Sequence, residues 1–588
     1  MRPHGFKLLL ALLLSASDLS ECLSGHYHQR AVSSSPSGGG GGAAAAAGAA
    51  ASPPSVRLSN GTYIGVRNDQ YAQDFFLGIP YARPPVGPLR YAPPQPLDES
   101  FDEPRSAAEY GRMCIGYGSD TASLGSPVSE DCLTINIVRP AGTKPGDNLP
   151  VGLWVHGGSY VNGGSLDPRY NLSYIVQQSV RENKPIIAAS INYRLSYWGF
   201  LFSRELQDGK AGNLGFRDQR LALRWLRDNI APFGGGPDKV TVWGESAGAR
   251  SLGMQLIAHD GRHDGLFRSA ILQSGSSVAK FVGAEAWQPF FDALLRKTSC
   301  DAAPGDAAAR LACLRALPWQ TLDGIFNGSD PLGVAAPAIT AVVDGDFITA
   351  QASALLRRGK FAPVPLLLGN NLDEGTGYAR QGVNTTEQFE AWVASSLQVD
   401  AAQVAAISRL YPDDPAVGIP ASHPGRPSGA LAAFGSQWKR VAAVAGDYQQ
   451  HSGRRLLASS YARVGLPVYS YAWNVHVNGF GPIYGATHFQ EVVFVFNNVR
   501  ALGYATDPFE GKPGSYFELA DLMSKMWVAF IHDTDPNQCN NAPRLAWPRY
   551  TPRRPQNLVF DANHTRLGYV ARDDYRAAEI AYMQEHVF

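Results

Sequence analysis

The most informative segment of this 588-residue chain is Val240-Thr-Val-Trp-Gly-Glu-Ser-Ala-Gly-Ala249. A β-branched apolar run ends here in the pattern G-x-S-x-G, and further apolar residues follow. The pattern predicts a strand, a tight turn and a helix, with Ser246 at the turn and the backbone N–H of Ala247 free to meet an oxyanion. A Cβ on Gly244 or Gly248 would collide with neighbouring backbone where strand and helix approach. We therefore interpret Ser246 as a nucleophile; the alternative is a structural turn serine.

The rest of the chain alternates predicted strands with predicted helices. The predicted strands are Ser55–Val66 (a hairpin bent at Asn60-Gly61), Glu130–Val138 (alternating), Pro150–Val155, Pro185–Asn192, Ser269–Leu272, Val364–Leu368 and Val468–Val477. Residues Phe76–Gly87 are proline-rich and predicted to be extended, and Gly215–Ile230 has the apolar spacing of a helix. Such alternation implies an α/β protein with a parallel-rich sheet covered by helices on both faces. We expect a single domain over residues 55–588.

The two ends of the chain predict export. Basic residues precede the apolar run Leu8–Leu14, which is far shorter than the roughly 20 residues that span a bilayer. We expect a signal peptide over residues 1–22, cleaved between Ala16 and Ser24. A disordered leader rich in Gly, Ala and Ser is expected over residues 23–54. The C-terminal end shows neither a hydrophobic tail nor a retention tetrapeptide, so we expect a secreted, extracellular protein.

The charge balance excludes some classes of partner. Lys plus Arg and Asp plus Glu number 51 each, so the formal net charge is zero. A neutral chain gives no electrostatic reason to expect nucleic acid or an anionic membrane surface as a partner. The hydrophobic content of 45% is that of a packed globular enzyme. We expect no stable membrane insertion, and the oligomeric state stays open.

In an exported protein, cysteines can form disulfides and asparagine sequons can carry glycans. The six cysteines are Cys22, Cys114, Cys132, Cys300, Cys313 and Cys539. The local pairings are Cys114 with Cys132 and Cys300 with Cys313, although the sequence leaves the connectivity open. Clustered Cys and His ligands, which a zinc site would need, do not occur. Five N-x-S/T sequons fit an exported glycoprotein: Asn60, Asn171, Asn327, Asn384 and Asn563.

Six spaced motifs resemble those of type-B carboxylesterases, the branch of the α/β-hydrolases that includes cholinesterases and fungal lipases. The motifs are Phe76-Leu-Gly-Ile-Pro-Tyr-Ala82, Ser129-Glu-Asp-Cys-Leu133, Trp154-Val-His-Gly-Gly158, Gly212-Asn-Leu-Gly-Phe-Arg-Asp-Gln219, Gly244-Glu-Ser-Ala-Gly248 and Asp373-Glu-Gly375. The resemblance runs from about residue 55 to about residue 580, and the residues around Ser246 are most like those of secreted fungal members. It implies an α/β-hydrolase fold, with a large mostly parallel central sheet flanked by helices and a small N-terminal antiparallel hairpin.

The resemblance also implies a catalytic triad. An alcohol nucleophile needs a base for its proton, and the base needs an acid that fixes its tautomer. In this fold the chain order is serine, acid, histidine. The family's acid position falls on Glu374, not Asp373, and its base position falls on His488. The alternatives are a solvated loop carboxylate and a satisfied loop histidine. His476 lies inside a predicted strand and is interpreted as packed or solvated.

The oxyanion hole implied by the resemblance consists of the backbone N–H groups of Gly158, Ser159 and Ala247. Ser159 departs from the usual third glycine of the family: its N–H survives, but its side chain narrows the pocket mouth. Losing one such donor raises the barrier by roughly 3–4 kcal/mol, so the main chain must still point inward. Phe489 is a second departure, since many relatives have glycine there. We therefore do not infer the shape of the substrate pocket from those relatives. His156 is interpreted as a packed ring.

The resemblance thus implies a serine hydrolase that cleaves small-molecule carboxylic esters through an acyl-enzyme, without metal or organic cofactor. In the resembling lipases, the loop closed by the first disulfide is a long lid that opens at a lipid surface. Here only 17 polar, Gly/Ser-rich residues lie between Cys114 and Cys132. We therefore expect soluble, short-to-medium-chain esters, with a lipase or sterol esterase for long-chain lipid esters as the alternative. The loop contains no tryptophan, which disfavours choline esters.

Two further interpretations stay open. One is a non-catalytic adhesion or binding module of the same fold, although relatives of that kind lose the serine and this chain keeps Ser246, Glu374 and His488. The other is an esterase dedicated to a secondary metabolite. The sequence specifies neither the acyl group nor the alcohol of the substrate.

Overall fold

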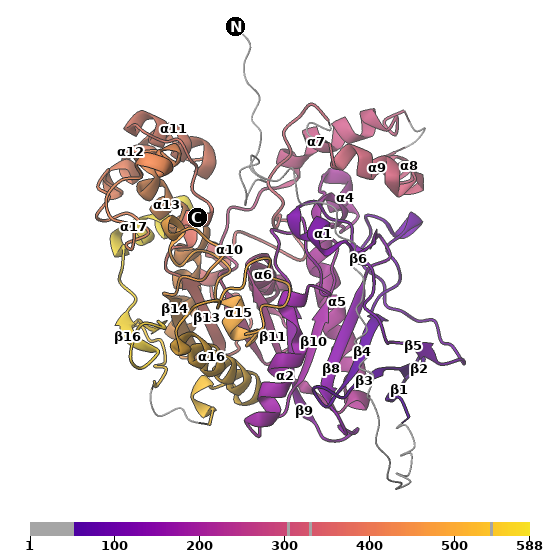
Figure 1. Ribbon diagram of the computed structural model, residues 1–588. Helices are drawn as coiled ribbons and strands as arrows, with labels where there is room; N and C mark the ends of the chain where they lie inside the picture. Colours follow the sequence, from indigo (N-terminus) through magenta and orange to yellow (C-terminus); the bar gives the residue numbers. More distant parts are fainter. Residues whose placement is uncertain (1–51, 303–305, 329–331, 541–544) are drawn as a thin grey trace, which may run out of the picture. The chain divides into compact units, whose positions relative to one another are not determined.

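The apolar, β-branched runs of the chain form one large sheet (Figure 1). The structure is a computed structural model that describes residues 52–302, 306–328, 332–540 and 545–588. The expected signal peptide, and the expected leader apart from residues 52–54, lie outside these ranges. No helix in the described ranges is long and apolar enough to span a bilayer.

Within the described ranges, the main sheet has 11 strands, and its centre is parallel. Their spatial order is β16 (Gly568–Arg572), β15 (Gln556–Phe560), β14 (Val468–Trp473), β13 (Leu366–Asn371), β12 (Ser269–Gln273), β11 (Gly235–Glu245), β9 (Leu149–Val155), β10 (Ile187–Ile191), β8 (Thr134–Pro140), β4 (Gln73–Pro80) and β3 (Val66–Asn68). The strands from β15 to β10 pair in parallel, whereas β16, β8, β4 and β3 pair antiparallel at the two edges. The mostly parallel sheet expected from the sequence is confirmed.

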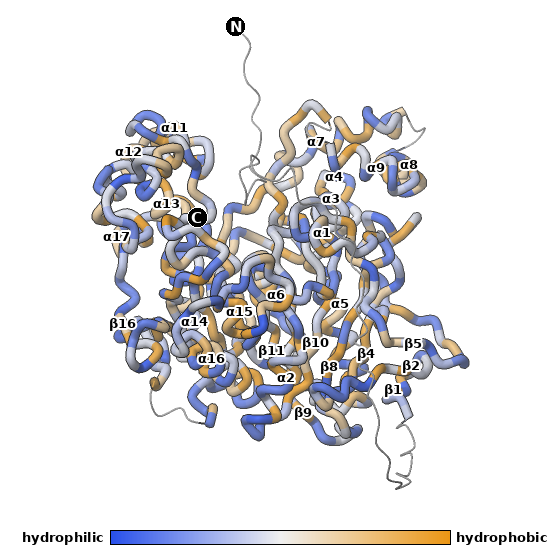
Figure 2. The backbone as a smooth tube through the Cα atoms, in the orientation of Figure 1, coloured by the Kyte–Doolittle hydropathy of each residue, from blue (hydrophilic) through white to orange (hydrophobic). Residues whose placement is uncertain are grey.

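Both faces of the sheet are buried. Successive residues of a strand point to opposite sides, so each central strand contributes side chains to both hydrophobic cores. On β9, Leu153 belongs to one hydrophobic core and Trp154 to the other, and on β11 the same is true of Val242 and Trp243. Figure 2 shows the hydrophobic residues along the central strands and the hydrophilic ones on the outer loops and helices. A parallel sheet needs such cover on both faces, which is why its strands read as continuous apolar runs.

Helices supply the cover on each face. Helices α5 (Leu214–Asn229), α6 (Ala247–Gly261) and α14 (Ser452–Arg463) pack into the first core, and α2 (Leu172–Arg181) and α16 (Gly514–Asp533) pack into the second. Within the described ranges, six shorter helices complete this part of the domain. They are α1 (Ser119–Leu124), α3 (Ser196–Phe200), α4 (Arg204–Asp208), α10 (Ala352–Arg357), α15 (Val492–Val495) and α17 (Ala577–Tyr582).

Two groups of helices are inserted after strands of the parallel centre and lie above the sheet in the view of Figure 1. Helices α7 (Ala284–Lys297), α8 (Ala307–Ala316) and α9 (Trp319–Phe326) follow β12, and α11 (Thr386–Leu397), α12 (Ala401–Leu410) and α13 (Trp438–Gly446) follow β13. Each group has a hydrophobic core of its own. Ligands of parallel sheets bind outside the carboxyl ends of the strands, where these insertions begin.

The N-terminal hairpin is confirmed, with a bend one residue earlier than expected. It consists of β1 (Ser55–Leu58) and β2 (Gly61–Ile64), and β5 (Arg105–Ser106) pairs in parallel with β2. Leu58 pairs with Gly61, so the bend is Ser59-Asn60 and not Asn60-Gly61. Gly61 instead begins the second strand with φ of +144°, and a Cβ there would lie 2.3 Å from the Phe101 ring.

Two other predicted segments differ from the structure. The run Glu130–Val138 was predicted as an alternating strand, but β8 begins at Thr134 and is buried on both faces. Its polar residue Asn136 is buried as well, because its Nδ2 donates to Ser165 Oγ at 2.9 Å. The strand predicted over Val468–Val477 is shorter, because β14 ends at Trp473, before His476. The segment from Phe76 is extended as predicted and begins within β4 of the main sheet.

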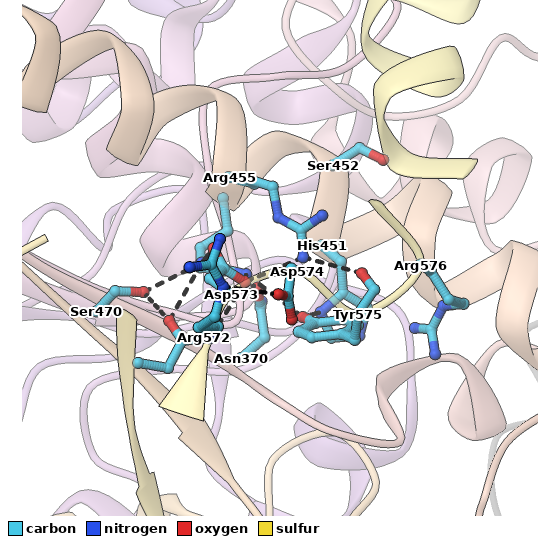
Figure 3. A network of polar contacts seen from close by, with 12 residues as sticks. Asn370, His451, Ser452, Arg455, Ser470, Arg572, Asp573, Asp574, Tyr575 and Arg576 are labelled. Carbon is cyan, nitrogen blue, oxygen red and sulfur yellow. Dashed lines mark hydrogen bonds and ion pairs between the residues drawn. The ribbon is translucent and has the colours of Figure 1, made fainter. Parts of the chain in front are cut away.

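A buried polar network ties α14 to the last strands (Figure 3). The guanidinium of Arg454 donates twice to the carboxylate of Asp573, at 2.7 Å each, and Arg455 donates to the same carboxylate at 3.0 Å. Arg454 Nε donates to Asn370 Oδ1 at 3.1 Å. Because Asn370 is the penultimate residue of β13, next to the loop that carries Glu374, this network helps to fix one side of the candidate site.

Candidate active site

Ser246 occupies a sharp turn between β11 and α6. Its backbone angles are φ 55° and ψ −124°, which a residue with a side chain adopts only under constraint. The constraint comes from close packing on both sides. A Cβ on Gly244 would lie 2.8 Å from Val155 O, and one on Gly248 would lie 2.0 Å from the same oxygen. The steric requirement for both glycines, which the sequence predicts, is therefore present.

Three predicted side chains meet at this turn. Ser246 Oγ lies 2.9 Å from His488 Nε2, and His488 Nδ1 lies 2.6 Å from Glu374 Oε2. Glu374 is fully buried, and its second oxygen accepts the backbone N–H of Asn371 at 2.9 Å. The serine follows β11, the glutamate begins a short 3-10 turn after β13, and the histidine lies in the loop after β14. The structure thus brings together one residue from each of three strand ends.

Two further carboxylates surround the histidine, and the sequence reasoning missed both. Glu245 Oε1 lies 3.2 Å from His488 Nε2, without hydrogen-bond geometry because that nitrogen faces Ser246. Glu491 is fully buried and accepts Asn371 Nδ2 at 2.9 Å. Glu245 belongs to the motif Gly244–Gly248, and Glu491 lies three residues after His488. An acidic residue inside a buried apolar motif was the available signal.

The electrostatics of this cluster follow from burial and proximity. Burial alone would lower the pKa of His488, but the carboxylates of Glu245 and Glu374 raise it to about 9. Burial raises the pKa of Glu245 well above its ordinary value, and the nearby Glu491 adds to that shift. Burial, followed by the charge of Glu374, also raises the pKa of Glu491. The carboxylates around the His488 ring therefore stabilise its protonated, imidazolium form.

The predicted oxyanion-hole residues lie beside the serine. Gly158 and Ser159 have φ of 95° and 55°, and a Cβ on Gly158 would lie 2.2 Å from Asn162 O. Ala247 is the first residue of α6, where the N–H has no partner within the helix. Among the residues that the structure describes, no acceptor takes the backbone N–H of these three residues. These donors are thus available to a bound oxygen.

Ser246 lines a cavity of about 240 Å³. The other lining residues are Ser159, Tyr160, Ala247, Arg250, Val278, Ala279, Lys280, Ala338, Ile339, Thr340, Tyr378, Tyr448, Gln449 and Phe588. Tyr448 and Gln449 come from a π-helical turn, Asp447–His451, between α13 and α14. The cavity is therefore lined by segments that follow the central strands and by segments that flank the two inserted helix groups, not by the inserted helices themselves.

The loop between Cys114 and Cys132 is short, and a disulfide and an ion pair fix its position. These two cysteines form a disulfide, as do Cys300 and Cys313, and the buried Cys539 is free. Helix α1 lies within the loop, and its Asp120 pairs with Arg169 at 3.1 Å. The Arg169 guanidinium in turn lies 4.9 Å from the ring centre of Phe489, directly after His488. Phe489, which departs from the family pattern, is thus a contact between the loop and the histidine segment.

The remaining predicted residues have ordinary surroundings. His156 stacks on Tyr193 with 4.6 Å between ring centres, and burial lowers the pKa of its ring to about 4. His476 lies beyond β14, and its Nε2 is 2.9 Å from Phe480 O. The exposed sequon asparagines are Asn327, Asn384 and Asn563, whereas Asn60 and Asn171 are half-buried. Asn171 accepts the N–H of Ser173 as the N-cap of α2.

The sheet, the serine turn and the hydrogen-bonded Ser–His–Glu chain define an α/β-hydrolase. The chain belongs to the carboxylesterase family, whose family model matches residues 52–583. It is a carboxylic ester hydrolase, and the alternative of a non-catalytic module of the same fold is thereby disfavoured.

Named relatives agree with this assignment. Lipase 4 of Diutina rugosa is 34% identical over 563 residues, an alignment that covers 89% of this chain and 94% of the relative. Secreted lipase 1 of Botryotinia fuckeliana is 32% identical over 506 residues, covering 81% and 84%. The crystal structure of Aspergillus niger EstA superposes with a TM-score of 0.76 at 25% identity, covering 90% of this chain and 98% of that one.

Proposed function

We propose that this protein cleaves carboxylic esters through a covalent acyl-enzyme on Ser246. The observation that carries the proposal is the continuous hydrogen-bonded chain from Ser246 Oγ through His488 to the buried Glu374, which opens on a cavity. Nucleophile and base within 2.6–3.2 Å, with the base oriented by a third group, is the arrangement that activates a hydroxyl.

The reaction runs in two balanced steps. His488 Nε2 takes the hydroxyl proton as Ser246 Oγ attacks the ester carbonyl, and the resulting oxyanion accepts the N–H groups of Gly158, Ser159 and Ala247. The imidazolium returns the proton to the departing alcohol, leaving the acyl-serine. Water then attacks with His488 as base, and the acid and the free serine are formed. Glu374 holds Nδ1–H and stabilises the imidazolium.

The proposed substrates are soluble esters of short to medium chain length. The support is the loop that would act as a lid: it is 17 residues long, and its one helix, α1, buries no side chain. Such a loop is too small to shield a long apolar trough. The relatives named as lipases favour the second candidate, a lipase or sterol esterase for long-chain esters.

A panel of 4-nitrophenyl esters from acetate to palmitate tests both parts of the proposal. We expect the highest kcat/KM at short and medium chain lengths and no jump in rate at the solubility limit; a jump would favour the lipase. Ser246→Ala should abolish turnover and labelling by a fluorophosphonate probe. Labelling that persists in this variant would contradict the assignment of the nucleophile.

We also propose that the protein is exported, with the signal peptide at residues 1–22, the leader at residues 23–54 and one catalytic domain from residue 55. Two disulfides and a relative named as a secreted lipase support this. N-terminal sequencing of protein recovered from culture medium should give a start between residues 17 and 24. An intact Met1 in the medium would contradict the signal peptide. Glycan mass on the exposed sequons is the matching test of glycosylation.

A further inference from the structure

The charged side chains that line the cavity beside Ser246 are cationic. Two of its lining side chains, Arg250 and Lys280, are cationic, and no described lining residue is an aspartate or a glutamate. We propose that this cavity selects esters that bear a carboxylate elsewhere in the molecule, and that Arg250 and Lys280 bind that carboxylate. The inference rests on the proposed function, because it names the substrate class of the same site.

Arg250 lies one helical turn beyond the nucleophile. Its backbone N–H donates to Ser246 O at 2.9 Å, which closes the first turn of α6. Its Nη2 donates to the main-chain oxygen of Gln449 and, at 3.0 Å, to Gln449 Oε1. Within the described ranges its Nε and Nη1 have no hydrogen-bond partner, and no carboxylate pairs with the guanidinium. A guanidinium fixed on one side in this way keeps donors free for a carboxylate.

Lys280 lies on the segment between β12 and α7. Its Nζ donates to Leu397 O at 2.8 Å and to Gln398 O at 3.0 Å, where α11 ends. These carbonyl groups orient the ammonium without neutralising it. Burial lowers the pKa of Lys280, and no carboxylate of the described residues opposes that shift. The ammonium therefore keeps one N–H free for a ligand, and no carboxylate of the described residues neutralises it.

The cations of the cavity differ from the buried arginines of the scaffold. Arg90 pairs with Glu130 at 2.6 Å, and Arg194 pairs with Asp218 at 2.6 Å. The carboxylates nearest His488, those of Glu245, Glu374 and Glu491, do not line the cavity. Phe588, another lining residue, is the last residue of the sequence and carries its α-carboxylate. One oxygen of this group accepts Ser353 Oγ at 2.8 Å, and within the described ranges it forms no ion pair with Arg250 or Lys280. Unpaired charge in a partly desolvated cavity attracts an anion more strongly than the same charge in water.

The carboxylate can sit on the acyl part or on the alcohol part of the ester, and two pairs of substrates separate these cases. For the acyl part we compare mono(4-nitrophenyl) adipate with the 4-nitrophenyl ester of adipic acid monoamide. For the alcohol part we compare 4-carboxyphenyl butyrate with 4-carbamoylphenyl butyrate. Each pair differs only in carboxylate against carboxamide, so the ratio of kcat/KM within a pair measures the preference for the anion.

We expect a ratio of about tenfold or more in at least one pair, falling as salt concentration rises. Arg250→Gln and Lys280→Gln should each lower that ratio severalfold, and the double variant should bring it close to one. The conservative variants Arg250→Lys and Lys280→Arg should keep part of it. Matched controls are Arg181→Gln on α2 and Lys297→Gln on α7, both exposed and outside the cavity, which should leave the ratio unchanged.

A ratio near one in both pairs, or a ratio that Arg250→Gln and Lys280→Gln leave at the wild-type value, would overturn the inference. Thermal melting identifies a variant that fails to fold, and the conservative variants then supply the test. Hydrolysis of the carboxamide esters that is lost in Ser246→Ala would uphold the proposed function in that event. Failure of the two proposals is therefore distinguishable.

Discussion

At the scale of single residues, the site depends on the charge of the His488 ring. In the proposed mechanism the ring must be neutral to accept the serine proton, yet Glu245 and Glu374, acting against burial, raise its pKa to about 9. Below that pKa the ring is increasingly protonated and cannot act as base. We therefore expect kcat/KM for 4-nitrophenyl butyrate to rise from neutral to alkaline pH. A profile already flat at pH 7, after correction for spontaneous hydrolysis, would contradict this.

Glu245→Gln should change that profile. The substitution removes a carboxylate 3.2 Å from His488 Nε2 and with it part of the stabilisation of the imidazolium. The pKa of His488 should fall, and the ascending limb of kcat/KM should move to lower pH. Glu103→Gln, at an exposed position, is the matched control and should leave the limb in place. An unmoved limb in the Glu245 variant would show that this carboxyl group is neutral beside the ring.

At the scale of elements, the junction of α14 with the last strands depends on Asp573 (Figure 3). Asp573→Asn would leave Arg454 and Arg455 buried without their counter-charge, because the side chain of Asp573 is 0% exposed. Removing one partner of such a pair costs about 3–5 kcal/mol of unfolding free energy. We expect a clear fall in the urea midpoint.

The neighbouring Asp574 provides the control for this prediction. Its side chain is 57% exposed and pairs with the exposed Arg572, so Asp574→Asn should change the unfolding free energy by less than about 1 kcal/mol. Although burial opposes it, Arg454 and Arg455 hold the pKa of Asp573 far below its ordinary 3.8. Its contribution is therefore present above pH 3.8 and declines as pH falls below that value. Equal midpoints for the two variants at pH 7 would contradict the prediction.

At the scale of the whole molecule, the cysteines give a simple test. Four of the five described cysteines are paired, and burial raises the pKa of the Cys539 thiol to about 11. We expect no reaction of the native exported protein with a thiol reagent at pH 7, and one thiol per chain in denaturant. A second thiol would show that Cys22 is retained in the exported protein. No thiol at all would show that Cys539 is oxidised.

The parts of the fold that sequence could predict are those fixed by near neighbours. The G-x-S-x-G turn is one, because its pattern lies within five consecutive residues, even though the glycines also meet Val155 O of the neighbouring strand β9. The central strands are another, since burial on both faces makes them continuously apolar. The strand β8 was misread, because Asn136 is buried and satisfied by Ser165, which an alternating pattern counts as exposed.

The candidate site was predictable only in part, for the same reason. Nothing local distinguishes His488 from twelve other histidines, and its assignment needed the resemblance to a family. The proximity of Glu245 to that ring depends on a contact between segments far apart in the chain. The same holds for Arg250 and Lys280, whose place on one cavity is set by tertiary packing.

The distances along the chain between the three hydrogen-bonded residues have a consequence for synthesis. His488 is 242 positions beyond Ser246 and 114 beyond Glu374. A polypeptide still emerging from the ribosome holds the hydroxyl long before it holds a proton acceptor for it. Under the proposed mechanism, we therefore expect the nascent chain to be inert toward esters until the segment bearing the imidazole has docked.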